Sequence, residues 1–100
     1  MEIFIIGLGA MGSNLALNLI SKGYSLKAYD ENSSLMNKLH SSTSNKLEIL
    51  PSIKKLMENS KKQKLVLISL PVNSIDECIN NLLPHLNEND IIADLGNTFY

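Results

Sequence analysis

The chain has 100 residues, of which 44% are hydrophobic and 19% charged, a balance typical of one globular domain and not of a disordered segment. Nine lysines and ten acidic residues give a net charge of −1, so no global charge attracts nucleic acid or an anionic membrane. A single cysteine, Cys78, excludes an intrachain disulfide and a four-cysteine metal site. Because no secretory signal and no membrane-spanning apolar run is evident, we expect a cytoplasmic protein.

Short apolar runs alternate along the chain with longer segments of helical periodicity. Residues 2–6 form a β-branched and aromatic run, which is typical of a strand buried on both faces. After a glycine-rich stretch, residues 10–22 predict a helix, and residues 26–29 predict a second strand. Ser33 or Ser34 is expected to cap the next helix.

The second half of the chain continues this alternation. A polar loop at 41–46 leads into a short strand at 47–50, and Ser52 is expected to cap the helix that follows. The remaining predicted elements are a strand at 64–70, a helix at 74–83 and a strand at 90–94. Because strands and helices alternate, we predict an α/β fold in which five parallel strands form a doubly wound sheet within one domain.

The six residues that follow the first predicted strand have the spacing G-x-G-x-x-G. A strand ends before them and a helix begins within them, which is the context that a dinucleotide-binding turn requires. In such a turn the first glycine allows the tight bend, the second leaves room for a pyrophosphate, and the third lets the helix pack closely. The N–H groups at the helix start attract the diphosphate. The predicted cofactor contacts are Gly7, Leu8, Gly9, Ala10, Met11 and Gly12, and the alternative is a structural turn without ligand.

Asp30 lies at the end of the second predicted strand, where a dinucleotide site places an acid that accepts hydrogen bonds from the adenosine ribose. A carboxylate there favours NAD, because it repels the 2′-phosphate of NADP, and Glu31 adds to this repulsion. The chain contains no arginine, the residue that commonly pairs with that phosphate. The cofactor is therefore predicted to be NAD or NADP, with NAD favoured. The alternative for Asp30 is an ordinary acid in a turn.

Both ends of the chain resemble the β-hydroxyacid dehydrogenase superfamily, and most closely its 6-phosphogluconate dehydrogenase branch. Residues 5–18 are similar to the family's opening strand and glycine turn, and residues 82–86 to its L-x-P-x-L segment. Residues 94–98 (D-L-G-N-T) are similar to its more discriminating D-G-G-N-[ST] motif. The resemblance covers the whole chain. It implies a Rossmann-type fold and, for the full enzyme, oxidative decarboxylation of 6-phosphogluconate to ribulose 5-phosphate in the pentose phosphate pathway.

The resemblance also assigns roles to individual positions. Asn97 of the end motif would contact both the nicotinamide and the substrate. Two further segments correspond to the family's N-R-T and V-x-A-G cofactor loops, and they contribute Asp30, Glu31, Asn32, Ser69, Leu70 and Pro71. Pro71 offers no N–H to a cofactor. Leu95 replaces a family glycine, and it would strain or crowd the site if that glycine is needed for backbone angles or for close approach of the cofactor.

Length is the largest departure from the family. Its members follow the cofactor domain with a helical domain that supplies the catalytic lysine and most of the substrate contacts. We therefore expect residues 1–100 to be the N-terminal cofactor domain of a longer, homodimeric enzyme, with no catalytic residue of its own. Two alternatives stay open: a nucleotide-binding module without catalysis, and a related dehydrogenase that acts on another β-hydroxyacid.

The remaining chemistry-bearing residues favour structural roles. No metal site is predicted, because neither His40 nor His85 has partners at ligand spacing. Cys78 is expected to be a buried, inert thiol. The basic run Lys61, Lys62 and Lys64 is interpreted as a solvated loop, and Met11, Met36 and Met57 as filler of the core or of a pocket.

Overall fold

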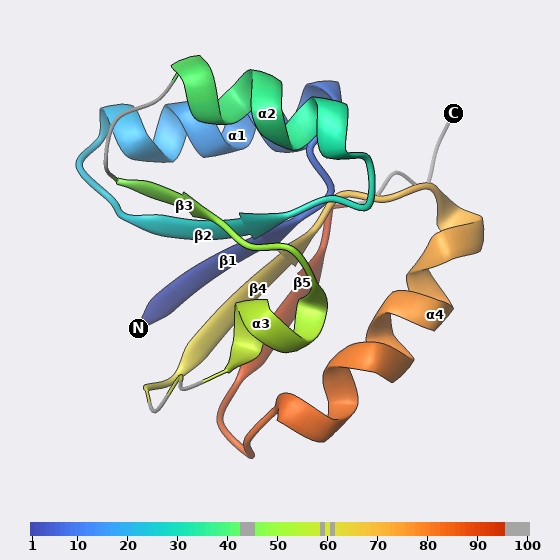
Figure 1. Ribbon diagram of the computed structural model, residues 1–100. Coiled ribbons are helices and arrows are strands. Elements are labelled where there is room, and N and C mark those ends of the chain that lie inside the picture. The colour runs from blue at the N-terminus through green and yellow to red at the C-terminus, as the bar shows by residue number, and fades with distance from the viewer. Residues whose placement is uncertain (43–45, 59, 61, 96–100) are drawn as a thin grey trace.

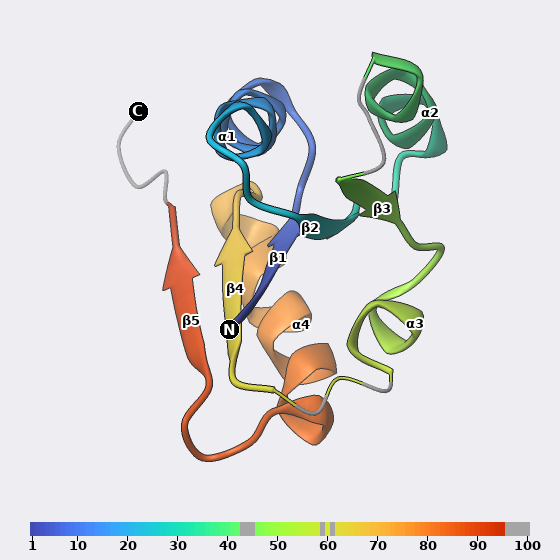
Figure 2. The same cartoon turned by 90° about the vertical axis from the view of Figure 1, so that its left-hand side faces the viewer.

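A parallel sheet with the strand order β3-β2-β1-β4-β5 forms the centre of the molecule (Figures 1 and 2). The structure is a computed structural model that describes residues 1–42, 46–58, 60 and 62–95. The strands are β1 (Glu2–Ile6), β2 (Leu26–Tyr29), β3 (Leu47–Ile49), β4 (Lys64–Ile68) and β5 (Ile91–Asp94). The predicted fold class, a Rossmann-type doubly wound sheet of five strands, is confirmed.

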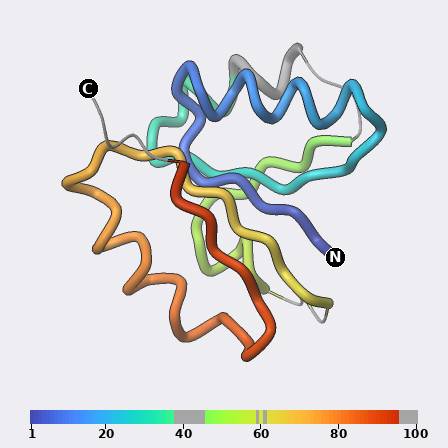
Figure 3. Tube along the Cα trace, turned by 180° about the vertical axis from the view of Figure 1, so that it is seen from behind, coloured from blue at the N-terminus to red at the C-terminus, as the bar shows by residue number. Residues whose placement is uncertain are grey.

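Helices cover both faces of this sheet. They are α1 (Ala10–Ser21), α2 (Ser33–Ser42), α3 (Ile53–Met57) and α4 (Val72–Leu82), and a 3₁₀ turn at Leu83–His85 follows the last of them. Helices α1 and α2 lie on one face, and α3 and α4 lie on the other (Figure 1). Figure 3 shows the two layers from behind, with α1 on one side of the sheet and α4 on the opposite side. Within the described segments, no helix has the length and apolar character needed to cross a membrane.

The central strand β1 is buried on both faces, as its unbroken apolar run predicts. Phe4 and Ile6 belong to the core beneath α3 and α4. Ile5, between them, belongs to the core beneath α1 and α2. The alternation of side chains along a strand thus divides one apolar run between two hydrophobic cores.

Two helix starts differ from the predictions. Asn32, and neither Ser33 nor Ser34, caps α2, because its side-chain Oδ1 accepts a hydrogen bond from the backbone N–H of Ser34 at 2.9 Å. Helix α4 begins at Val72, two residues before the predicted start, because Pro71 supplies the extended residue that precedes it (φ −57°, ψ 148°). Ser52 caps α3 as predicted, accepting from Lys55 N.

The outer ends of three elements also shift. Helix α2 continues to Ser42, into the loop predicted at 41–46, and residues 43–45 lie outside the described part of the chain. Strand β3 ends at Ile49 and β4 at Ile68, both before the predicted ends. After Ile68, the last residue of β4, the chain passes next to the glycine turn, where the carbonyl oxygen of Ser69 lies against Gly7.

Lys64 is not part of a solvated loop, and the prediction for it is wrong. Its Nζ lies 3.1 Å from Asp90 Oδ2, and the two side chains are only 1% and 2% exposed. The backbone N–H of Lys64 also donates to Asp90 Oδ1 at 2.8 Å, and the N–H of Asn87 donates to Oδ2 at 2.7 Å. This buried pair fastens the turn before β5 to the first residue of β4.

Replacing Lys64 with methionine should lower the free energy of unfolding by about 3 kcal/mol at pH 7, because it leaves the buried carboxylate of Asp90 without its cation. Lys55→Met is the matched control. The pair of Lys55 with Glu58 is 57% and 40% exposed, so its loss should change stability by less than about 0.5 kcal/mol. Urea unfolding of the two variants measures both values.

The effect of Lys64→Met should also depend on pH. Burial raises the pKa of Asp90, but the N–H groups of Asn87 and Lys64 and the Lys64 ammonium outweigh this and hold the pKa below its usual value of 3.8. The stabilisation is therefore complete above about pH 4, and it is lost as the pH falls through the lowered pKa. The difference between wild type and Lys64→Met should shrink in that acid range. A difference that is equally large at pH 2.5 would contradict this assignment.

Candidate functional site

The glycine turn lies at the carboxyl edge of the sheet, between the end of β1 and the start of α1. Strands β2 and β4 flank β1, and the helices that follow them, α2 and α4, go to opposite faces (Figure 1). This divergence creates the crevice in which open α/β sheets bind their ligands. The turn predicted from the sequence therefore occupies the topological switch point of the fold.

Two glycines of the turn are required by contacts within the protein. Gly7 has φ +102°, and a Cβ on it would lie 2.1 Å from the carbonyl oxygen of Ser69. A Cβ on Gly12 would lie 1.9 Å from the carbonyl oxygen of Gly7. Gly9 is different, because a Cβ there would meet nothing within 4 Å. The side of the turn at Gly9 is therefore open to a ligand, while Gly7 and Gly12 permit close backbone packing.

Asp30 fixes the turn from the end of β2. Its Oδ2 accepts a hydrogen bond from the backbone N–H of Leu8 at 2.6 Å, and its Oδ1 accepts one from the N–H of Asn32 at 2.7 Å. The residue is only 8% exposed. Since Asn32 caps α2, the carboxylate of Asp30 connects the glycine turn to the start of that helix.

Leu8 is fully engaged within the protein. Its N–H donates to Asp30, its carbonyl oxygen accepts from Ser13 Oγ at 2.6 Å, and its side chain is buried in the core beneath α1 and α2.

The start of α1 differs from Leu8 in its contacts with other side chains. Gly9 is its N-cap, and within the described residues no side chain caps this end of the helix and no acidic residue stands in its first turn. The positive end of a three-turn helix therefore faces the open side of Gly9.

The segment after β4 closes the other side of the turn. The N–H of Ser69 donates to the carbonyl oxygen of Ile6 at 2.8 Å, and the carbonyl oxygen of Ser69 lies against Gly7. Leu70 follows, and then Pro71, the N-cap of α4, which has no N–H of its own. The structure thus brings together three of the segments predicted to contact a cofactor, residues 7–12, 30–32 and 69–71, although Gly12 and Asp30 are 18 residues apart in the sequence and Asn32 and Ser69 are 37 apart.

A cavity of about 240 Å³ opens beside Asp30, and we name it the β2–α4 cavity. It is lined by Ile6, Tyr29, Asp30, Glu31, Ile53, Leu70, Ser74, Glu77, Cys78 and Asn81. Apolar side chains of β1, α3 and the segment after β4 form part of its lining, and carboxylates stand on two sides of it. The contribution of α4 to this cavity was not predicted from the sequence. The signal that could have revealed it is the spacing of residues 74, 77, 78 and 81, which places them on one helix face.

Two titratable groups of this cavity are held in their neutral forms. Burial, followed by the charges of Glu31 and Asp30 and by Cys78, raises the pKa of Tyr29. Burial raises the pKa of the Cys78 thiol to about 11. The thiol is therefore protonated near neutral pH, so the prediction of a buried, inert cysteine is confirmed.

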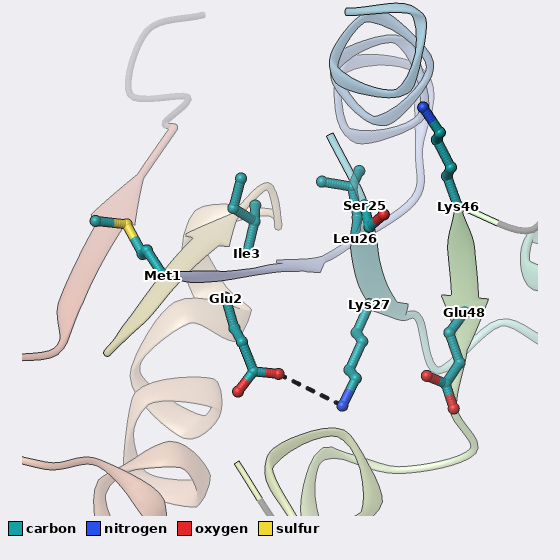
Figure 4. Close-up of a pocket in the computed structure, with 8 residues that line it drawn as sticks. All are labelled: Met1, Glu2, Ile3, Ser25, Leu26, Lys27, Lys46 and Glu48. Carbon is teal, nitrogen blue, oxygen red and sulfur yellow. Dashed lines mark ion pairs between the residues drawn. The ribbon is translucent and has the colours of Figure 1, made fainter. Parts of the chain in front are cut away.

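A second cavity, of about 250 Å³, lies at the opposite, amino edge of the sheet (Figure 4). It is lined by Met1, Glu2, Ile3, Ser25, Leu26, Lys27, Lys46 and Glu48. Figure 4 shows the ion pair between Glu2 and Lys27, at 3.6 Å, beneath β1 and β2. None of the described residues that line this amino-edge cavity belongs to the glycine turn or to the start of a helix, so it is not the predicted cofactor site.

Three further predictions have separate outcomes. Met11 is 51% exposed at the start of α1, so it is not core filler. Leu95 continues the β-ladder by donating to the carbonyl oxygen of Ile68 at 2.8 Å, and it packs against the core beneath α1 and α2. Its side chain is thus accommodated by the core. Asn97, the predicted nicotinamide and substrate contact, lies outside the described residues.

In the part of the chain that the structure describes, no group of three or more His, Cys, Asp or Glu could hold a metal ion.

Gly12→Ala and Gly9→Ala should differ sharply in stability. The Cβ of alanine at position 12 collides with the backbone of Gly7, so this variant should lose about 3 kcal/mol of unfolding free energy or fail to fold. Alanine at position 9 enters open space, so Gly9→Ala should lose no more than about 1 kcal/mol. Thermal unfolding monitored by circular dichroism tests the difference. Equal losses would contradict the contacts assigned to this turn.

Comparisons with known proteins identify the family of this chain. A family model described as the NAD binding domain of 6-phosphogluconate dehydrogenase matches residues 2–100. The decarboxylating 6-phosphogluconate dehydrogenase of Candida albicans is 35% identical over 102 residues, which cover 99% of this chain and 20% of that protein. The NADP(+)-dependent, decarboxylating enzyme of Bacillus subtilis (strain 168) is 35% identical over 101 residues, covering 99% of this chain and 22% of that protein.

A solved structure shows the same relationship. The 6-phosphogluconate dehydrogenase of Plasmodium falciparum, studied in its apo form and in complex with NADP+ and with 6-phosphogluconate, superimposes with a TM-score of 0.86 and 31% sequence identity. The match covers 100% of this chain and 22% of that one, so the chain spans about a fifth of the length of these relatives. The resemblance inferred from the motifs is confirmed, and the chain belongs to the family of NAD-binding domains of 6-phosphogluconate dehydrogenase.

Proposed function

We propose that this chain is the N-terminal cofactor domain, residues 1–100, of a decarboxylating 6-phosphogluconate dehydrogenase, and that it binds NAD in preference to NADP. The observation that carries the proposal is the open side of Gly9 at the start of α1, which no described side chain caps, next to Leu8, whose N–H donates to the carboxylate of Asp30. The Candida, Bacillus and Plasmodium relatives are 6-phosphogluconate dehydrogenases, which supports the reaction.

The pyrophosphate would lie over Gly9, on the N–H groups at positions 10–12. Gly9 leaves the space that two phosphates need, and the helix end supplies partial positive charge. Leu8 serves the site indirectly, because its buried side chain and its bond to Asp30 fix the turn. Ser69, Leu70 and Pro71 would contact the dinucleotide from the other side of the crevice.

Asp30 would accept a hydrogen bond from the adenosine ribose in addition to its two backbone bonds. A carboxylate offers about four acceptor positions, and two of these are used within the protein. The adenine ring would enter the β2–α4 cavity, whose lining includes the apolar side chains of Ile6 and Leu70. Asn32, which caps α2, would support this arrangement from the segment after β2.

The preference for NAD follows from charge. A 2′-phosphate on the ribose would lie close to the carboxylates of Asp30 and Glu31, and the chain contains no arginine to neutralise it. The Bacillus relative is NADP-dependent by name, and the Plasmodium structure contains NADP+. This chain would therefore differ from both in its cofactor.

In the complete enzyme, which we propose to be a homodimer, NAD supplies the hydride acceptor for the oxidation that precedes decarboxylation. The residues of this chain would bind and orient that cofactor, and Asn97 would contact the nicotinamide and 6-phosphogluconate. We assign no catalytic acid or base to residues 1–100. These belong to the substrate domain expected from the resemblance.

Gly9→Ala tests the pyrophosphate site. The new methyl group should occupy the space of the diphosphate, so the Kd for NAD should rise by about tenfold or more, while the fold is retained. Isothermal titration calorimetry measures the Kd. Asn14→Ala, an exposed change on the same helix, is the control and should leave it unchanged. Unaltered NAD binding by Gly9→Ala would exclude this turn as the site.

Glu31→Arg tests the cofactor preference. A guanidinium in place of the exposed carboxylate should raise the affinity for NADP relative to NAD by about tenfold or more, because it can form charge-assisted hydrogen bonds with the 2′-phosphate. Glu48→Arg makes the same charge change in the amino-edge cavity and should leave the ratio unchanged. A wild type that binds NADP more tightly than NAD would refute the proposed preference.

A further inference from the structure

We infer that Glu77 and Asn81 of α4 recognise the base of the dinucleotide and select adenine over a 6-oxopurine such as hypoxanthine. This inference rests on the proposed function, and it adds a specificity that the glycine turn and Asp30 do not provide. It starts from the composition of the β2–α4 cavity, which combines an apolar slot with polar side chains of one helix face.

One face of α4 forms a wall of this cavity. Ser74 is followed by Glu77 and Cys78, three and four residues later, and Asn81 follows these two by four and three residues; all four line the cavity. Residues at this spacing lie one above another on a helix. Asp30 and Glu31 line the cavity from the end of β2. A ligand whose ribose lies at Asp30 would therefore extend its base toward α4.

The slot suits a flat, neutral heterocycle. Ile6 and Cys78 are buried, and Leu70 and Ile53 are half-buried, so they offer apolar surface to the faces of a ring. The thiol of Cys78 is protonated, so the apolar part of the lining carries no charge. The volume of about 240 Å³ lies just below the range of about 300–1,000 Å³ typical of small-molecule pockets, as suits one part of a larger ligand.

The two polar side chains complement the Watson–Crick edge of adenine. The carboxylate of Glu77 can only accept hydrogen bonds, whereas the amide of Asn81 can donate and accept. Adenine presents its 6-amino group, a donor, beside N1, an acceptor. Glu77 would accept from the amino group while Asn81 donates to N1. Within the described part of the chain, no hydrogen bond or ion pair engages either side chain, so both are available to a ligand.

Hypoxanthine reverses this pattern. It presents a carbonyl oxygen at position 6 and an N–H at N1. Asn81 can adapt by rotating its amide, but the carboxylate of Glu77 cannot donate to the carbonyl oxygen and repels it. Glu77 therefore carries the discrimination. A lost hydrogen bond to a charged group corresponds to about a tenfold change in affinity.

The test compares NAD with nicotinamide hypoxanthine dinucleotide, which differs only in the base. Calorimetric titration of the wild type should give a Kd for NAD about tenfold lower than that for the hypoxanthine analogue. In Glu77→Gln the amide can donate to the 6-oxo group, so the ratio should approach one. Asp76→Asn is the matched control. It removes the same charge from the same helix, at an exposed position that does not line the cavity, so it should keep the ratio of the wild type.

The outcomes separate this inference from the function on which it rests. Failure of the folded chain to bind NAD at all would overturn the proposed function. Binding of both dinucleotides by the wild type with equal affinity would leave that function intact and overturn the base recognition. Equal changes of the ratio in Glu77→Gln and Asp76→Asn would show a general charge effect, and would also overturn it. Melting curves of both variants establish that each is folded.

Discussion

The carboxylate of Asp30 holds the candidate site in one arrangement. Its two short hydrogen bonds, at 2.6 Å to Leu8 N and 2.7 Å to Asn32 N, join the glycine turn, the end of β2 and the start of α2. The N–H of Leu8, which is buried, would otherwise need another acceptor. The open side of Gly9 and the start of α1 are thereby fixed beside the crevice before a ligand arrives, which reduces the entropy lost on binding.

Backbone contact explains why the rest of the site can approach this turn so closely. Gly7 lies against the carbonyl oxygen of Ser69, and Gly12 lies against that of Gly7, with no room for a Cβ at either position. The segments after β1 and β4 are thus packed through main-chain atoms. Strand β2 is attached both by the hydrogen bond that Gly7 N donates to the carbonyl oxygen of Tyr29, at 2.9 Å, and by the side chain of Asp30. At the far end of the sheet, the buried pair of Lys64 and Asp90 fixes β5 against β4. The carboxyl edge can therefore present loops for binding without losing the register of the strands.

Local sequence patterns predicted the fold and the glycine turn. The features that could not be predicted depend on contacts between residues that are distant in the sequence or on the geometry of a turn. The alternation of apolar runs with helical segments, and the glycines at 7, 9 and 12, act over a few residues, so their consequences were visible in the sequence. Lys64 was misassigned because its partner lies 26 residues away, and a lysine in a basic run gives no local sign of burial. The cap of α2 was misplaced because residues 32–34 are all good caps, and only the geometry of the turn selects Asn32. The lining of the cavity by α4 could not be predicted because it depends on the topology of the sheet, which places Asn81 and Asp30 around one cavity.

The most direct test of this account is a titration of the ¹⁵N-labelled chain with NAD, followed by two-dimensional NMR of its backbone amides. We predict that the largest shifts occur at the amides of residues 9–13, at Glu31 and Asn32, and along the face of α4 that lines the β2–α4 cavity. Amides around the amino-edge cavity, such as those of Ser25 and Lys27, should remain unchanged. Shifts concentrated at that edge, or no shifts at the glycine turn at saturating NAD, would contradict the central claim that this crevice is a dinucleotide site.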